Sequence, residues 1–398
     1  MTTHQASTDA WDRLLRLAPD VGLRLRGGQV EISMGDRHHV AEMRVLGILE
    51  LFAYPMSLRE AFGRLGAVGT EEFVQGKRLV LRLREKRVLV DAHRDSPRFV
   101  TGFGAPWAHV AMLDDVTRTS AFVRAIHATV RPGDVVLDVG TGTGVLAVEA
   151  ARAGARRVYA VEQRGIGEGA RDVFGANGLA DRIQVVQGSS TSIALPERAD
   201  VLVSEILGND PLAEGILSTF RDARERHLKL SAQVVPRAVT VFALPVDLPN
   251  KYLDAHTFSE ANVARWREDF SIDFGPLTTF GVGVTNLPNV KPQAARRWVT
   301  IGDPVELARI DLTRVDRVRP RTVTFVARSS ARCLGLLLYF EAELAPGVLL
   351  STAPRAAADD NHWSCCVFRA AERPTLSAGD VACIEFSAAT GQTVLRVR

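Results

Sequence analysis

The chain has 398 residues, of which 46% are hydrophobic and 24% are charged, and its formal net charge is +3. This length predicts two or three domains of ordinary globular composition. The small charge disfavours both the basic surplus of a nucleic-acid binder and the acidic surface of an enzyme that attracts very basic protein tails. Residues 1–13 do not read as a signal peptide, no stretch is long enough to span a membrane, and the four cysteines lack zinc-site spacing. We therefore expect a cytoplasmic protein with reduced thiols and no metal.

Residues 1–96 are predicted to form a separate N-terminal module. Apolar residues recur at helical spacing over residues 42–52, and Ser57 to Glu60 has the pattern of a capping box. A third helix should begin near Thr70, and a strand should follow at residues 87–91. This order predicts a small winged-helix-like fold. The third segment carries a basic cluster that nucleic-acid phosphate could contact, but interleaved leucines favour a solvated helix face, so nucleic-acid binding ranks below partner or self-association. The cluster comprises Lys77, Arg78, Arg82, Arg84, Lys86 and Arg87.

Residues 97–233 are predicted to form a Rossmann-like α/β domain. Residues 99–119 should be helical and should lead into a strand at residues 135–139. Glycines 140, 142 and 144 follow that strand, and such a loop lets backbone approach a ligand and directs helix N–H groups at it. Val145 stands where the nicotinamide-binding fingerprint requires glycine. Glu162 ends the next strand, where an acid can hold ribose hydroxyls. The order favours S-adenosylmethionine over a dinucleotide.

Two glutamates mark the loop after the fourth strand, residues 201–203. Glu205 and Glu214 are placed where the strands of an open α/β sheet carry their ligands. A pair of convergent carboxylates suits one planar guanidinium, whose N–H donors form a rigid fork. The blander interpretation is one loop acid and one acid in the first turn of a helix at residues 215–226.

The pattern changes to short alternating strands after residue 230, which predicts a β-barrel over residues 234–398. Residues 249–280 interrupt it with a helical insertion, centred on residues 259–270.

Together these motifs resemble the arginine N-methyltransferase family over about residues 99–398. The resemblance implies a class I S-adenosylmethionine-dependent Rossmann-like domain followed by a β-barrel, and a homodimer formed through an arm at residues 249–280. It implies that Glu205 and Glu214 hold the substrate, and that His362, in an Asn-His-Trp sequence similar to the family's Thr-His-Trp loop, pairs with Asp115. The implied cofactor-binding residues are Met112, Arg118, Asp138, Gly140, Gly142, Gly144, Glu162 and Ser190.

The substrate pocket departs from the family pattern at several positions. Phe99 and Phe103 stand where many members have tyrosines, and Ile206 stands where a tryptophan often follows the first glutamate. The acid that often contacts adenine is missing from residues 189–192, so either the backbone there or Ser190 is expected to substitute for it. Trp363 should shape the arginine pocket.

The resemblance implies an S-adenosylmethionine-dependent Nω-methyltransferase that acts on the guanidino group of arginine. Our first expectation is free L-arginine, as in the stand-alone enzymes of bacterial natural-product biosynthesis. The alternative is a peptide or protein arginine. A lower-ranked alternative is a nucleic-acid-binding regulator with a methyltransferase-like body. A nucleic-acid amino-methyltransferase would be expected to carry an Asn/Asp-Pro-Pro-aromatic loop where Ser204 to Asn209 stand.

Overall fold

The computed structural model describes residues 14–18, 21–34, 37–53, 55–65, 70–92, 105–280, 286–314, 318–372, 374–388 and 393–398. They fall into two compact units, Met1–Thr101 and Gly102–Arg398. Each unit has hydrophobic core residues of its own. Among the described residues, no helix is both long and apolar enough to cross a bilayer.

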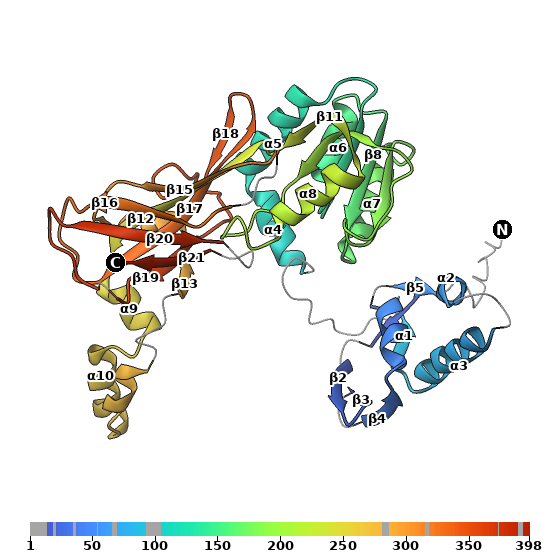
Figure 1. The fold of residues 1–398 in the computed structure, drawn as a ribbon, viewed down its shortest axis with the longest axis horizontal. Coiled ribbons are helices and arrows are strands. Elements are labelled where there is room, and N and C mark those ends of the chain that lie inside the picture. The colour runs from blue at the N-terminus through green and yellow to red at the C-terminus, as the bar shows by residue number, and fades with distance from the viewer. Residues whose placement is uncertain are drawn as a thin grey trace, which may run out of the picture. The chain divides into compact units, whose positions relative to one another are not determined.

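The N-terminal unit combines three helices with two three-stranded sheets, ordered β5-β1-β6 and β2-β3-β4 (Figure 1). The three predicted helices and the final strand are present. Ser57 and Thr70 begin the second and third helices by accepting from the backbone N–H groups of Glu60 and Phe73. The elements are β1 (Leu14–Leu17), β2 (Val21–Arg26), β3 (Gln29–Met34), β4 (Arg37–Glu42), α1 (Val45–Leu51), β5 (Met56–Ser57), α2 (Leu58–Arg64), α3 (Glu71–Glu85) and β6 (Leu89–Asp91).

The meander β2-β3-β4 was not predicted from the sequence. Its middle strand buries Val30, Ile32 and Met34 against the helices, whereas Leu23 and Leu25 of β2 stay exposed. The apolar residues of β2 therefore do not report which face is buried, and only β3 follows the alternation expected of a half-buried strand.

The second unit begins with a parallel sheet in the order β11-β10-β7-β8-β9. The chain runs outward from β7 through β8 to β9 and then crosses to β10 on the other side of β7. Ligands of open α/β sheets bind at such a switch point in strand order. The four strands predicted here are confirmed. The elements are α4 (Pro106–Asp114), α5 (Val116–Thr129), β7 (Val135–Val139), α6 (Val145–Arg152), β8 (Arg157–Glu162), α7 (Ile166–Ala176), β9 (Ile183–Gln187), β10 (Ala199–Ser204), α8 (Ile216–Arg226) and β11 (Leu228–Val235).

The predicted helix over residues 99–119 is wrong at one point, because α4 ends at Asp114 and α5 begins at Val116. Asp115 between them has φ −75° and ψ 78°, outside the helical region. Its carboxylate accepts from the N–H of Arg118 at 2.8 Å, so it caps α5. An aspartate at this position competes with helix continuation by satisfying the N-terminal donors of the next helix. Residues 99–104 lie outside the described residues.

An antiparallel β-barrel completes the second unit (Figure 1). Strands β12 and β17 pair along ten residues, from Ala238↔Glu343 to Asp247↔Leu334. One buried core includes side chains of both the parallel sheet and the barrel. The elements are β12 (Ala238–Asp247), β13 (Asn286–Val290), α11 (Pro292–Ala295), β14 (Val299–Thr300), β15 (Val305–Asp311), β16 (Arg321–Val326), β17 (Leu334–Ala345), β18 (Val348–Ser351), β19 (Cys365–Arg369), β20 (Val381–Ser387) and β21 (Val394–Val397).

The predicted helical insertion follows β12. It consists of α9 (Asn250–His256), α10 (Glu260–Phe270) and the short 3-10 helix η2 (Gly275–Thr279). In Figure 1 it extends away from the barrel strands. Ser259 begins α10 by accepting from the N–H of Asn262, which agrees with the helix expected over residues 259–270.

Candidate active site

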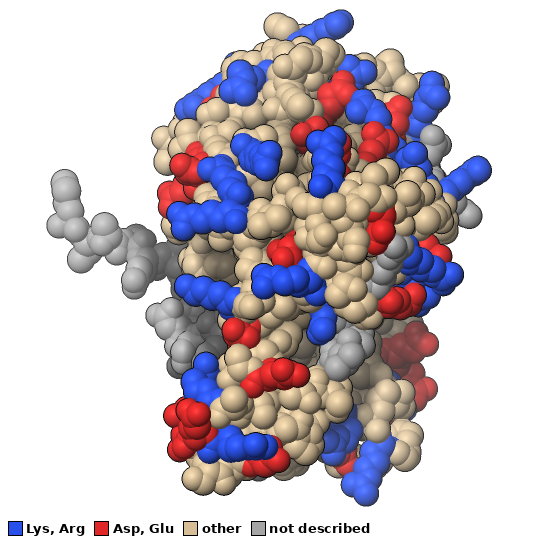
Figure 2. Space-filling model, turned by 90° about the vertical axis from the view of Figure 1, so that its left-hand side faces the viewer, with Lys and Arg blue, Asp and Glu red and all other residues tan. Residues whose placement is uncertain are grey.

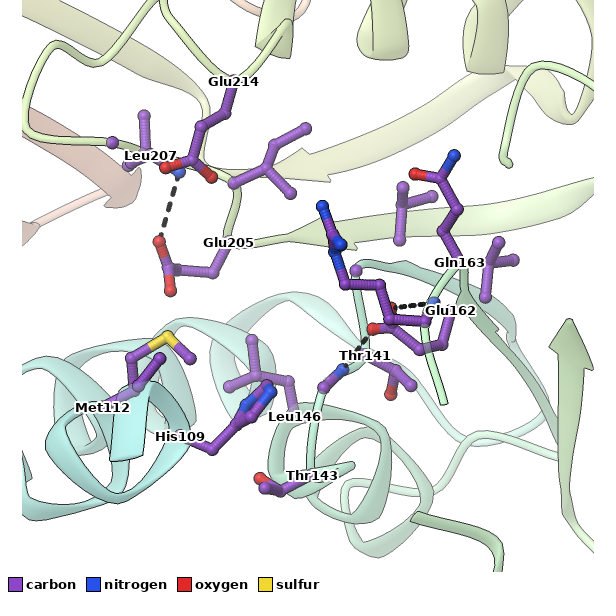
Figure 3. Close-up of a pocket in the computed structure, with 18 of the residues that line it drawn as sticks. His109, Met112, Thr141, Thr143, Leu146, Glu162, Gln163, Glu205, Leu207 and Glu214 are labelled. Atoms are coloured by element: carbon purple, nitrogen blue, oxygen red, sulfur yellow. Dashed lines mark hydrogen bonds between the residues drawn. The ribbon is translucent and has the colours of Figure 1, made fainter. Parts of the chain in front are cut away.

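A cavity of about 710 Å³ lies at the carboxyl ends of β7, β8 and β10 (Figure 3). Helix α4 and the loop before β19 complete its wall. Segments from distant parts of the chain therefore meet at the switch point of the parallel sheet. Eleven of the predicted site residues line this cavity: Met112, Arg118, Gly140, Gly142, Glu162, Ser190, Glu205, Ile206, Glu214, His362 and Trp363.

The glycine-rich loop is packed too closely for side chains at two positions. A Cβ at Gly140 would lie 2.9 Å from Ile206 of the double-glutamate loop. Gly144 has φ 89° and precedes α6, and a Cβ there would lie 2.4 Å from the ring of Phe174. Residues 140–143 of the loop line the cavity, so a ligand there can approach the N-terminus of α6.

Glu162, at the end of β8, holds this loop in place. Its carboxylate accepts from the N–H of Gly142 at 2.9 Å and from the N–H of Arg164 at 2.8 Å. The side chain lines the cavity beside Gln163 (Figure 3). A carboxylate at a strand end beside a bare glycine loop fits the ribose and amino-acid portions of S-adenosylmethionine, so the cradle is consistent with that cofactor.

Asp138 lies beneath the loop and does not line the cavity. It is fully buried and accepts from the hydroxyl of Thr141 at 2.6 Å. Burial raises the pKa of Asp138 to about 7, and the charge of Glu162 adds to that rise, while the Thr141 hydroxyl opposes it. The position predicted as cofactor-binding therefore supports the loop from below in this structure.

Glu205, the first glutamate of the loop, is buried in an ion pair with Arg118. Arg118 Nε donates to its carboxylate at 3.0 Å, Nη2 donates to the same oxygen, and Nη1 donates to the carbonyl of Met112 at 3.2 Å. The N–H of Leu207 donates to the other carboxylate oxygen. Arg118, predicted to bind the cofactor, thus fixes the first glutamate in this structure.

Glu214, the second glutamate, extends into the same part of the cavity as Glu205 (Figure 3). It immediately precedes Gly215, which begins α8. A Cβ at Gly208 would lie 2.8 Å from its Oε1, so glycine there leaves room for the carboxylate. Burial raises the pKa of Glu214 to about 7, and the nearby charge of Glu205 contributes to the rise. Within the described part of the chain no cation pairs with Glu214, whereas Glu205 pairs with Arg118.

Asp115 and His362, predicted as partners, are hydrogen-bonded. Asp115 Oδ2 accepts from His362 N–H at 3.0 Å and contacts His362 Nδ1 at 2.8 Å. Burial would raise the pKa of Asp115, but the hydrogen bonds from His362 and Arg118 hold the pKa of this carboxyl below its ordinary value. Asp115 does not line the cavity but lies behind His362, and it orients the imidazole.

The barrel fastens the double-glutamate loop from one side. Trp363 is 2% exposed, and its Nε1 donates to the carbonyl of Leu207 at 2.5 Å. The N–H of Ser364 donates to Asn209 Oδ1 at 2.7 Å, and the N–H of Thr393 donates to Asp210 Oδ2 at 2.6 Å. Both acceptors belong to the loop, so its shape depends on the barrel.

Sequence reasoning missed several residues of this site. His109 of α4 lines the cavity, and its ring would lie 3.3 Å from a Cβ at Gly142. Lys291 donates to the carbonyl of His362. The sequence places Asn209 in the loop but does not show that this residue anchors the loop to the barrel. The predicted pocket residues Phe99 and Phe103 lie outside the described residues.

Comparisons with known proteins also indicate a methyltransferase. Residues 116–229 match the family model described as ribosomal protein L11 methyltransferase (PrmA). The chain is 30% identical over 241 residues to a probable protein arginine N-methyltransferase 6 of Arabidopsis thaliana, a match that covers 59% of this chain and 54% of that protein. The protein arginine N-methyltransferase PRMT10 of the same plant is 26% identical over 319 residues, which cover 73% of this chain and 82% of the relative. The chain thus spans about half the length of the first relative and most of the second.

Solved structures confirm the predicted fold. The Trypanosoma brucei PRMT1 enzyme-prozyme heterotetrameric complex with AdoHcy has a TM-score of 0.62 at 24% identity, covering 75% of this chain and 94% of that chain. Arabidopsis thaliana protein arginine methyltransferase 10 has a TM-score of 0.56 at 25% identity, covering 71% and 88%. These matches confirm the resemblance found in the sequence and the Rossmann-like domain followed by a barrel.

Proposed function

Because the chain belongs to the arginine methyltransferase family, we propose that it transfers a methyl group to a guanidino nitrogen of arginine in a protein or peptide. The observation that carries this proposal is the meeting of Glu205 and Glu214 in one cavity with the glycine loop and Glu162. The two plant relatives are named as protein arginine methyltransferases. That favours the peptide alternative over free L-arginine, which was the first expectation from the sequence.

The cofactor side of the cavity is supplied by the glycine loop and Glu162. S-adenosylmethionine, when bound, provides a methyl group that its sulfonium has already activated. Glu162 would hold the ribose hydroxyls, Gly140 and Gly142 leave space for backbone approach, and Met112 of α4 lines the same wall. Correct positioning of two reactants in such a site can lower the activation free energy by about 7–11 kcal/mol.

The substrate side is governed by charge. Glu205 is neutralised by Arg118, whereas Glu214 has no such cation beside it among the described residues and a pKa of about 7. An incoming guanidinium would favour the ionised form of Glu214 and would be held by both carboxylates. The two glutamates would also draw the positive charge away from the attacking nitrogen and stabilise the methylated cation.

One proton must leave the guanidinium once the N–CH₃ bond forms. Two titratable side chains of the cavity are placed to receive it. Glu214 has a pKa close to neutral pH, which suits a general base. His362 is oriented by Asp115, so its imidazole presents Nε2 while Nδ1 contacts the carboxylate. The two glutamates and the His362–Asp115 pair are the proposed catalytic machinery.

The test is mass spectrometry of two reactions with S-adenosylmethionine, one containing an arginine-rich peptide and one containing free L-arginine. We expect the peptide to gain methyl groups. The Glu214→Gln variant should lose turnover but still bind cofactor, and Glu225→Gln, at an exposed glutamate of helix α8, should behave as the unaltered protein. Methylation of free arginine alone would overturn the peptide assignment, and loss of cofactor binding in Glu214→Gln would overturn its role.

We propose further that the protein is a homodimer, formed through the insertion at residues 249–280. Its tip exposes apolar side chains, with Phe270, Ile272 and Phe280 exposed by 60%, 52% and 70%. Charges on the face in Figure 2 are interspersed, with Lys and Arg beside Asp and Glu. This mixed distribution does not resemble a phosphate-binding stripe. Light scattering of Phe270→Asp should show a monomer, and an unchanged dimer would refute the arm's role.

A further inference from the structure

The N-terminal unit contains a second cavity, of about 440 Å³, between helices α1, α2 and α3. Its wall is apolar at Ile48, Leu51, Leu65 and Leu79. Gly47 also belongs to the wall, and a Cβ there would meet nothing within 4 Å, so the surface is recessed at that point. The cavity is therefore a groove that can receive apolar side chains.

One face of α3 extends this groove toward strand β4. Gln75, Leu79, Arg82 and Lys86 are spaced by four, three and four residues, which places them in one stripe along the helix. Gln75 and Leu79 line the cavity. At the other end of the stripe, Lys86 Nζ lies 3.5 Å from His39 Nδ1 of β4. Figure 1 shows β4 as the strand of its meander nearest to α3.

Strand β4 is an edge strand, because within the described chain it pairs only with β3. The pair Arg26↔Gln29 closes the two-residue turn Gly27–Gly28, so Gln29 hydrogen-bonds to β2 and the backbone groups of Val30 face β4. Val30↔Ala41 is therefore a hydrogen-bonded pair between β3 and β4. Hydrogen-bonded and non-bonded pairs alternate from there. The backbone N–H and C=O groups of His38, Val40 and Glu42 consequently point away from β3, and they form a template on which another strand can add.

Two basic residues of the α3 stripe, Arg82 and Lys86, extend toward this edge, and Lys86 Nζ lies 3.5 Å from His39 Nδ1 of β4. Residues 77–87 contain six basic residues and one acidic residue. Within the cavity wall, Arg44 and Arg64 have carboxylate partners at 2.7 Å in Glu42 and Glu60. No ion pair of Arg82 with a carboxylate is found among the described residues. The charge beside the edge therefore complements an acidic partner.

We propose that the β4 edge and the α1–α3 groove dock an extended acidic segment of the peptide substrate, apart from the arginine that is methylated. This inference rests on the proposed function. Main-chain hydrogen bonds to β4 would give affinity, the groove would accept apolar side chains, and Arg82 and Lys86 would pair with carboxylates. A nucleic acid would use the basic residues but neither the strand edge nor the apolar groove, so a peptide fits more of the observations.

The test uses the full chain and two synthetic peptides. The short peptide is Gly-Gly-Arg-Gly-Gly, and the long peptide adds eight alternating glutamate and valine residues through a flexible glycine-serine linker. We expect the long peptide to have a KM about tenfold lower at unchanged kcat, because docking raises the local concentration of the arginine. Arg82→Glu combined with Lys86→Glu should abolish the difference.

Backbone variants separate strand addition from charge. Val40→Pro removes an N–H that points away from β3, and it should also abolish the KM difference. Val40→Ala keeps that N–H, and Leu25→Pro removes an outward N–H on the opposite edge of the meander, so both should retain the difference. Each variant should methylate the short peptide at the unaltered rate, which verifies folding of the second unit, and circular dichroism with thermal unfolding should match the unaltered protein, which verifies folding of the N-terminal unit.

Equal KM values for the two peptides would refute the docking site while leaving the proposed function intact. Failure to methylate either peptide would instead refute the proposed function. Equal KM values together with salt-dependent binding of a single-stranded oligonucleotide, lost in the Arg82→Glu and Lys86→Glu variant, would identify the surface as a nucleic-acid site and also overturn the proposal.

Discussion

Replacing Glu214 by glutamine should make the protein more stable while removing its activity. The pKa of Glu214 rises from its ordinary value of 4.5 to about 7, because of burial and of the charge on Glu205. In the folded protein the carboxyl therefore keeps its proton between pH 4.5 and about 7, whereas the unfolded chain releases it. Folding stability accordingly falls as pH rises through this window and stays low above it.

The magnitude follows from that interval. At about 1.4 kcal/mol per pH unit, the ionised Glu214 costs up to about 3 kcal/mol of stability at pH 8. Relaxation of the site and residual exposure reduce this figure, so we expect glutamine to stabilise the substrate-free protein by about 1–3 kcal/mol. For a unit the size of Gly102–Arg398 that corresponds to a rise in Tm of roughly 2–5 °C.

The assay is thermal unfolding at pH 8 and pH 5.5, without substrate or cofactor. At pH 5.5 Glu214 is still mostly protonated in the folded protein, so most of the stability cost of its ionisation is absent. The stabilisation by Glu214→Gln should therefore shrink to about 1 kcal/mol or less. Glu225→Gln, at an exposed position of helix α8, should leave Tm unchanged at both pH values. A loss of stability in Glu214→Gln, equal at both pH values, would show that Glu214 is a structural residue and would refute the reasoning.

Three further predictions concern the same site. The kcat/KM for an arginine peptide should rise with pH through about 7 as Glu214 ionises, and a profile flat from pH 6 to 8 would contradict this. Asp115→Asn removes the charged acceptor of His362 and of the Arg118 N–H, so calorimetry should show a loss of about 2 kcal/mol, and kcat should fall on the order of 100-fold. Gly208→Ala places a Cβ 2.8 Å from Glu214 Oε1; peptide kinetics should show kcat/KM falling at least about tenfold, with cofactor affinity unchanged in titration. Normal kinetics in either variant would contradict the assigned geometry.

The sequence by itself determined the parallel sheet and the ligand edge. Strands Val135–Val139 and Ala199–Ser204 contain the apolar runs 135–137 and 201–203, since both faces of a parallel sheet are buried. Glycine spacing and the two glutamates then identified the ligand loops, because backbone approach and guanidinium binding each restrict the residue types that can serve. The resemblance to known methyltransferases linked Asp115 with His362 across 247 positions.

Only the tertiary structure decided how these groups act on one another. The Arg118–Glu205 ion pair, the elevated pKa of Glu214 and the anchoring of Leu207 by Trp363 join parts of the chain that local patterns do not connect. The meander β2-β3-β4 and the groove beside α3 were likewise absent from the pattern. Periodicity in sequence reports which face of an element is buried, whereas ion pairing, desolvation and groove shape depend on which elements pack together in space.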